Sequence, residues 1–98
     1  MAQQHEAAVA DQAGFADKEI AKKPHLVHEV KAIDNSNGQL ALYYVYVEPP
    51  RIAAFTEALA AGEDMNLEAY GRVLAACYGE EPTAEVRALL RKKYGIEV

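Results

Sequence analysis

The stretch DNSNGQLALYYVYV, from Asp34 to Val47, decides the fold of this chain. A type I′ turn requires positive φ at both central residues, and Asn37-Gly38 meets that requirement at low steric cost. The run after the turn is rich in Val and Tyr, which pack well on a pleated surface. The stretch therefore predicts a β-hairpin over residues 25–47.

The pairing register of this hairpin depends on the length of its turn. A two-residue turn at Asn37-Gly38 places Ala32 opposite Tyr43 and Val30 opposite Val45. It also leaves Glu29 and Lys31 on the other face, beside Tyr46 and Tyr44. A longer loop, from residue 34 to residue 38, would shift this pairing.

Proline and glycine divide the remainder of the chain into three short segments with helical spacing of apolar residues. We expect helices at about residues 51–61, 67–78 and 83–94. A glycine that can take the left-handed cap conformation follows each of them: Gly62, Gly79 and Gly95.

Residues 1–23 differ from the rest of the chain in being rich in Ala, Gln and charged residues. They predict a mobile or partly helical segment that docks through Phe15 and Ile20 and ends before Pro24. The fold class that we expect is α+β. It consists of an N-terminal β-hairpin followed by three short packed helices, in a single domain over residues 24–98.

Charge and cysteine content exclude several classes of function. The 98 residues hold 15 acidic and 10 basic side chains, a net charge of −5, which is unfavourable for binding nucleic-acid backbones or anionic membranes. The N-terminus lacks the basic and apolar regions of a secretory signal. Cys77 is the single cysteine, so no internal disulfide can form, and we expect a cytoplasmic protein.

The sequence contains no constellation of residues that predicts chemistry. His25 and His28 would point to opposite faces of a strand, which is the wrong arrangement for joint metal ligation. Cys77 lies on the apolar stripe of its predicted helix and has no neighbouring base, which favours a small buried hydrophobe. We therefore expect no catalytic residues, no metal and no cofactor.

Tyr44 and Tyr46 are the strongest candidates for a functional role. Exposed aromatic residues on a sheet form interfaces, but helices or the N-terminal segment would cover these two if the strand is buried on both sides. The leading hypothesis is a small non-catalytic cytoplasmic interaction module. It would bind a protein partner or a second copy through the tyrosine-bearing hairpin face or its edge.

Two other hypotheses remain open. The first is a small-molecule binder or enzyme with a shallow pocket formed by Tyr44, Tyr46, His28 and Arg51. The second and weaker one is a nucleic-acid-associated protein that uses the basic residues of the third helix. The N-terminal half of that helix, where DNA readers place their base contacts, contains no basic residue among residues 83–86.

Overall fold

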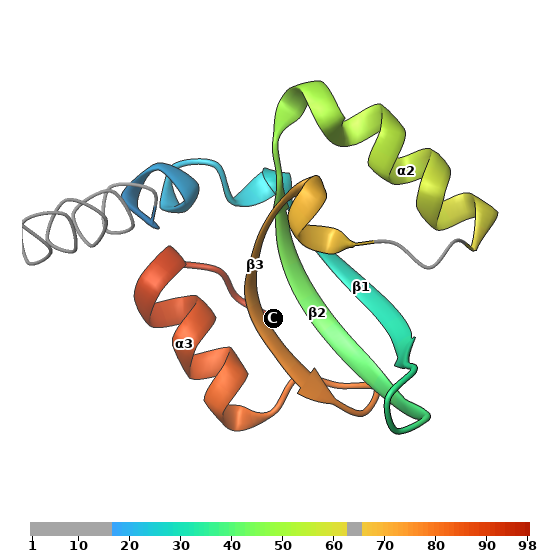
Figure 1. Cartoon of the computed structure of the whole chain (residues 1–98). Coiled ribbons are helices and arrows are strands. Elements are labelled where there is room, and N and C mark those ends of the chain that lie inside the picture. Colours follow the sequence, from blue (N-terminus) through green and yellow to red (C-terminus); the bar gives the residue numbers. More distant parts are fainter. Residues whose placement is uncertain (1–16, 63–65) are drawn as a thin grey trace, which may run out of the picture.

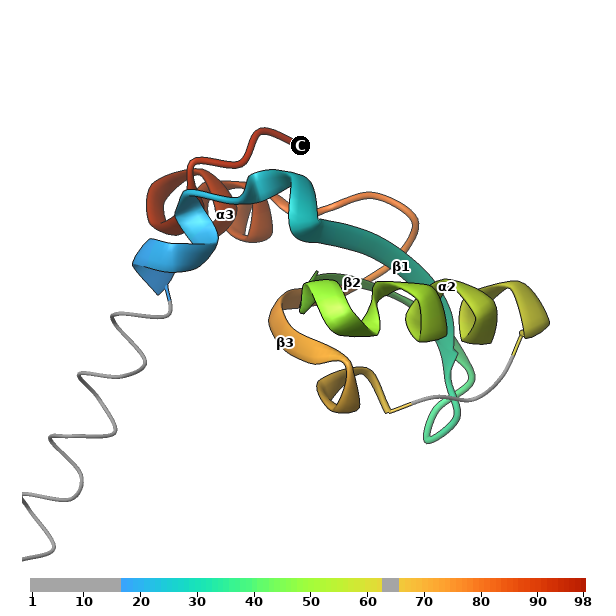
Figure 2. The same ribbon diagram turned by 90° about the horizontal axis from the view of Figure 1, so that it is seen from above.

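The computed structural model describes residues 17–62 and 66–98. Their strands β1 (Val27–Asp34), β2 (Gln39–Val47) and β3 (Gly71–Tyr78) form one antiparallel sheet in the order β1-β2-β3 (Figure 1). Helix α2 (Ile52–Ala61) connects β2 to β3, and helix α3 (Ala84–Tyr94) follows β3. The two helices lie on opposite sides of the sheet (Figure 2).

The α+β class is confirmed, but the order of elements differs from the prediction. Residues predicted as the second helix instead form a 3₁₀ turn, Leu67–Ala69, and the strand β3. The third strand is required by β2, which is apolar on both faces and needs a backbone partner along each edge. The other two predicted helices are confirmed as α2 and α3, and each ends at a glycine with positive φ, Gly62 and Gly95.

The hairpin is confirmed, while its two-residue turn is wrong. The loop spans residues 35–38 and pairs Ala32 with Ala41, a shift of two residues that leaves every side chain on its expected face. Gly38 has φ of +71°, whereas Asn37 does not have positive φ. The carboxylate of Asp34 accepts bonds from the amide and the hydroxyl of Ser36, at 3.0 and 2.7 Å, which stabilises the longer loop.

The core has two parts, one on each face of β2. The α3 side is closed by buried residues of the helical segment 17–21, β2 and α3: Ile20, Leu42, Tyr44, Val86, Leu90 and Tyr94. The α2 side is closed by buried residues of β1, β2 and α2: Val30, Val45, Val47 and Phe55. Helices therefore cover both faces of the central strand, the second of the two arrangements left open for Tyr44.

The segment before Pro24 reaches the core on the α3 side. Residues 17–21 are helical, and Ile20 is 3% exposed. Asp17 accepts bonds from the guanidinium of Arg72 at 2.6 Å and from the hydroxyl of Tyr94 at 3.1 Å. These contacts attach the segment to both β3 and α3. The expectations for residues 1–16, including docking of Phe15, lie outside the described residues.

Candidate interaction surface at the free edge of strand β1

Backbone geometry shows which groups of β1 point away from the sheet. Along an antiparallel strand, successive residues direct their N–H and C=O groups alternately to the two sides. The carbonyl of Leu40 accepts from the N–H of Gly79 at 2.8 Å, so Leu40 faces the β3 side and Ala41 faces β1. Ala41 pairs with Ala32, whose groups therefore point inward. The alternate residues of β1 consequently point outward, namely Glu29, Lys31 and Ile33.

This outer edge of β1 has the properties of a strand-pairing site. No backbone partner for the outward groups of Glu29, Lys31 and Ile33 occurs within residues 17–62 and 66–98. All three side chains are exposed, and Ile33 is 57% accessible to solvent. A row of unpaired N–H and C=O groups on an edge strand is a template for another strand.

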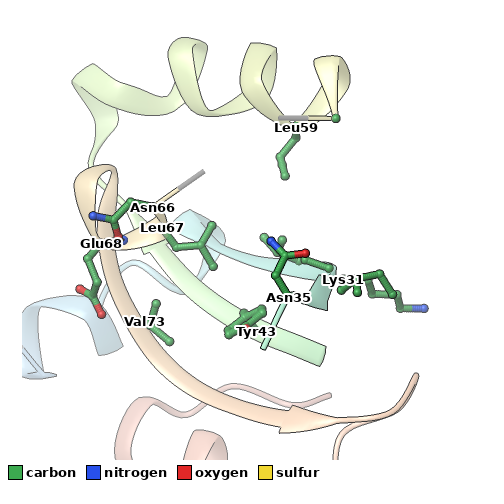
Figure 3. Close-up of a pocket in the computed structure, with 12 residues that line it drawn as sticks. Lys31, Asn35, Tyr43, Leu59, Asn66, Leu67, Glu68 and Val73 are labelled. Carbon is green, nitrogen blue, oxygen red and sulfur yellow. The ribbon is translucent and has the colours of Figure 1, made fainter. Parts of the chain in front are cut away.

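A groove lies beside this edge, between α2 and the sheet (Figure 3). Its volume is about 570 Å³. Side chains from α2 and all three strands line it, including Leu59, Val30, Tyr43 and Val73. Figure 3 shows Leu59 reaching from α2 towards the strands, while it remains 40% exposed. The groove therefore leaves apolar surface open to solvent, including part of the Leu59 side chain.

The buried residues of α2 are Phe55 and Ala58, whereas Leu59 near its end is 40% exposed. Phe55 is fully buried and packs against the ring of Tyr70, with centroids 5.6 Å apart. Leu59 lies about one turn after Phe55, and its side chain does not contact the sheet closely enough to be buried. The polar side chains of Asn66 and Glu68 stand at the rim.

His28 packs at the base of α2. Its ring lies 5.3 Å from that of Phe55, at an interplanar angle of 57°. Its Nε2 atom is buried and has no hydrogen-bond partner within the described part of the chain. An unpaired buried nitrogen of this kind lowers stability and does not by itself form a binding site.

Tyr44 is a core residue. It is 2% exposed, and its hydroxyl donates to the carboxylate of Glu29 at 2.7 Å. Burial raises the pKa of this phenol, and the bond to Glu29 raises it further. Tyr46 is half-buried on the same face, against the core cluster under α3. The tyrosine-bearing face is thus covered by α3, and the accessible feature is the edge beside it.

The other candidate of the small-molecule hypothesis, Arg51, has a local structural role. Its guanidinium donates to the carbonyl of Ala69 at 2.6 Å and lies 3.5 Å from the carboxylate of Glu48. Tyr44 and Tyr46 lie on the α3 face, while His28 lies on the α2 face. The structure does not bring the four predicted residues together into one pocket.

The remaining candidates also lie apart. Cys77 lies on β3 rather than a helix, and its Sγ is 3.8 Å from the carbonyl of Glu81. In α3, Arg87 donates to the carbonyls of Pro82 and Val98, at 3.2 and 2.8 Å. Within the described ranges no group of three His, Cys, Asp or Glu side chains could hold a metal. No helix in those ranges has the length and apolar character needed to cross a bilayer.

Sequence reasoning included the hairpin edge but did not identify Ile33, Leu59 or the pairing groups of Glu29 and Lys31. Alternation along β1 was the available signal, because it divides these residues into two faces. Comparisons with protein-family models, with curated proteins and with solved structures found no match.

Proposed function

We propose that this chain is a small non-catalytic interaction module that receives an extended segment of a protein at the free edge of β1. The observation that supports this function is the outward row of backbone groups on Glu29, Lys31 and Ile33. In strand addition, main-chain hydrogen bonds supply affinity, and pockets for alternate side chains supply specificity. The single cysteine is consistent with a cytoplasmic location.

The groove supplies the side-chain component of this recognition. A strand paired with β1 directs every second side chain to the α2 side of the sheet. There it meets the apolar surface of Leu59, Val30 and Tyr43. We therefore expect segments with β-branched or aromatic residues at alternate positions to bind best.

A small apolar ligand in the groove is the second candidate function. The volume of about 570 Å³ favours it, since this lies within the range of ligand sites. Such a ligand needs Leu59 and the sheet face but does not need the outward amides of β1. A variant that blocks only the amides separates the two candidates.

Lys31→Pro is that variant. It removes one outward N–H, and proline is tolerated on edge strands where the N–H faces solvent. Lys31→Ala is the matched control, because it removes the same charge but keeps the amide. A displayed library of random peptides, selected against the parent at low protein concentration, supplies the probes.

We expect selected peptides to bind the parent and Lys31→Ala comparably and to lose at least tenfold in affinity for Lys31→Pro. Circular dichroism melting curves should show that all three proteins are folded. Equal binding to Lys31→Ala and Lys31→Pro, or a selection that yields no binding peptide, would refute strand addition.

A further inference from the structure

We infer that the strand added to β1 is β1 of a second copy, paired antiparallel about a two-fold axis at Val30. This inference rests on the proposed function and names its partner. The resulting sheet would have six strands, with the two β1 strands at its centre. The charges and the backbone directions of β1 favour this register.

Symmetry restricts the register to a few choices. Directly opposed residues in an antiparallel pair lie on the same face, so a two-fold axis normal to the sheet must pass beside a residue of β1. An axis at Lys31 places two lysines opposite each other, and an axis at Glu29 does the same with two glutamates. Like charges directly opposite are destabilising. An axis at Val30 instead places Glu29 opposite Lys31 of the second copy, twice over.

The backbone directions agree with the axis at Val30. The groups of Val30 point inward to β2, as a pair without mutual hydrogen bonds requires. Glu29 and Lys31 point outward and can exchange two hydrogen bonds with each other across the interface. Ile33 also points outward, and its N–H can donate to the carbonyl of Val27 of the second copy. The N–H of Val27 is already bound to the carbonyl of Pro24. Val27 therefore contributes its carbonyl, and not its N–H, to the pair with Ile33.

The side chains on the α3 face fit this register as well. Ile33, 57% exposed in the single chain, would lie opposite Val27, a half-buried apolar residue. The hydroxyl of buried Tyr44 donates to Oε2 of Glu29 at 2.7 Å, so the other carboxylate oxygen, Oε1, can accept from the ammonium group of Lys31 in the second copy. Two features favour a second copy over an unrelated segment. The Glu29–Lys31 pairs are self-complementary in charge, and Ile33 would be covered by Val27 of the second copy.

Exchanging the charges tests both the partner and the register. Lys31→Glu alone places carboxylates opposite each other, and Glu29→Lys alone places ammonium groups opposite each other. Each should weaken self-association by roughly tenfold or more relative to the parent. An equimolar mixture of the two variants restores both opposite-charge pairs, so it should form the heterodimer. Sedimentation velocity over a concentration series measures all four samples.

A second measurement covers the case in which Glu29→Lys fails to fold after losing the bond from Tyr44. In an antiparallel pair without mutual hydrogen bonds, Cα atoms lie about 4.5 Å apart, within the range of a disulfide. Val30→Cys, in a Cys77→Ser background, should therefore form an intermolecular disulfide on mild oxidation. Ala32→Cys is the matched control, because in this register residue 32 faces residue 28 of the second copy.

The outcomes separate this inference from the function on which it rests. If the parent stays monomeric throughout the series and Val30→Cys forms no cross-link, the second copy is excluded. Library peptides that still distinguish Lys31→Pro from Lys31→Ala would then leave the proposed function standing. Loss of that discrimination as well would refute both. A parent that dimerises, with variants that dimerise equally well alone, would overturn the register at Val30.

Discussion

Replacing Gly71 with alanine tests the architecture, because this change would stabilise the predicted helix but destabilise the observed strand. Inside a helix over residues 67–78, Gly→Ala would stabilise the protein by about 1 kcal/mol. In the structure, Gly71 lies on β3 where it pairs with Val47. A Cβ there would overlap the carbonyl oxygen of Tyr46 and lie 2.8 Å from its carbonyl carbon.

The magnitude follows from what must move to relieve this overlap. The obstructing atoms belong to the backbone of β2, including the Cα of Val47 at 3.0 Å, so no side-chain rotation can help. Over-packing of this kind costs about 1–3 kcal/mol. Separating the two strands also weakens a neighbouring backbone hydrogen bond, such as that from the N–H of Glu48 to the carbonyl of Tyr70. The loss of such a bond costs about 1 kcal/mol of stability. We expect Gly71→Ala to lower the free energy of unfolding by about 2–4 kcal/mol.

Urea denaturation followed by circular dichroism measures this change. Gly62→Ala is the control: it adds a methyl group to open space, at a left-handed glycine with φ of +70°, and should cost about 1–2 kcal/mol through backbone strain alone. A Gly71→Ala protein that is as stable as the parent, or more stable, would refute the close approach of β3 to β2.

Three further substitutions test individual contacts. Tyr44→Ser should lower the free energy of unfolding by about 3–5 kcal/mol in urea, because the ring is 2% exposed; a loss below 1 kcal/mol would contradict its place in the core. Hydrogen bonds from Ser36, and to a smaller extent from Tyr78, lower the pKa of the Asp34 carboxyl. The ionised carboxylate therefore stabilises the folded protein fully above the ordinary carboxyl pKa of about 4, and this contribution disappears as the pH falls through the lower pKa of the folded state. Asp34→Asn should therefore flatten the acid limb of a plot of melting temperature against pH, and an unchanged limb would argue against these bonds. His28→Leu removes an unpaired buried nitrogen and should leave the melting temperature unchanged or higher, whereas a marked decrease would reveal a missed partner of Nε2.

The elements with strong local signals were predicted correctly. Residues 34–47 predict a hairpin because a glycine turn follows one strand-forming segment and precedes another. Apolar spacing and terminal glycines likewise predict α2 and α3. In each case the decisive interactions lie within a few residues, so the sequence pattern contains them.

The strand β3 depends on interactions that are distant in sequence. Leu67, Tyr70, Val73 and Cys77 recur at helical spacing, and nothing local excludes a helix there. The requirement for a strand comes from the second edge of β2, about 30 residues earlier in the chain. Gly71 was the one local indication, since a glycine inside a helical pattern suggests close approach of another backbone.

The candidate site was only partly accessible to prediction for a similar reason. The apolar character on both faces of β2 indicated that something must cover them, but not whether it is helices or a partner. Within residues 17–62 and 66–98, α3 covers the tyrosine face, and the edge of β1 and the groove under α2 remain exposed. The length of the turn depends on the side chain of Asp34, and a pattern based on Asn37-Gly38 cannot include it.

Amide hydrogen exchange at β1 tests the central claim most directly. In dilute protein, the outward N–H groups of Lys31 and Ile33 should exchange rapidly, while the inward N–H groups of Val30 and Ala32 stay protected. At high protein concentration, or with a saturating selected peptide, the outward groups should become protected as well. Outward amides that exchange rapidly under both conditions, or that are already protected in the dilute monomer, would contradict a free edge that receives a strand.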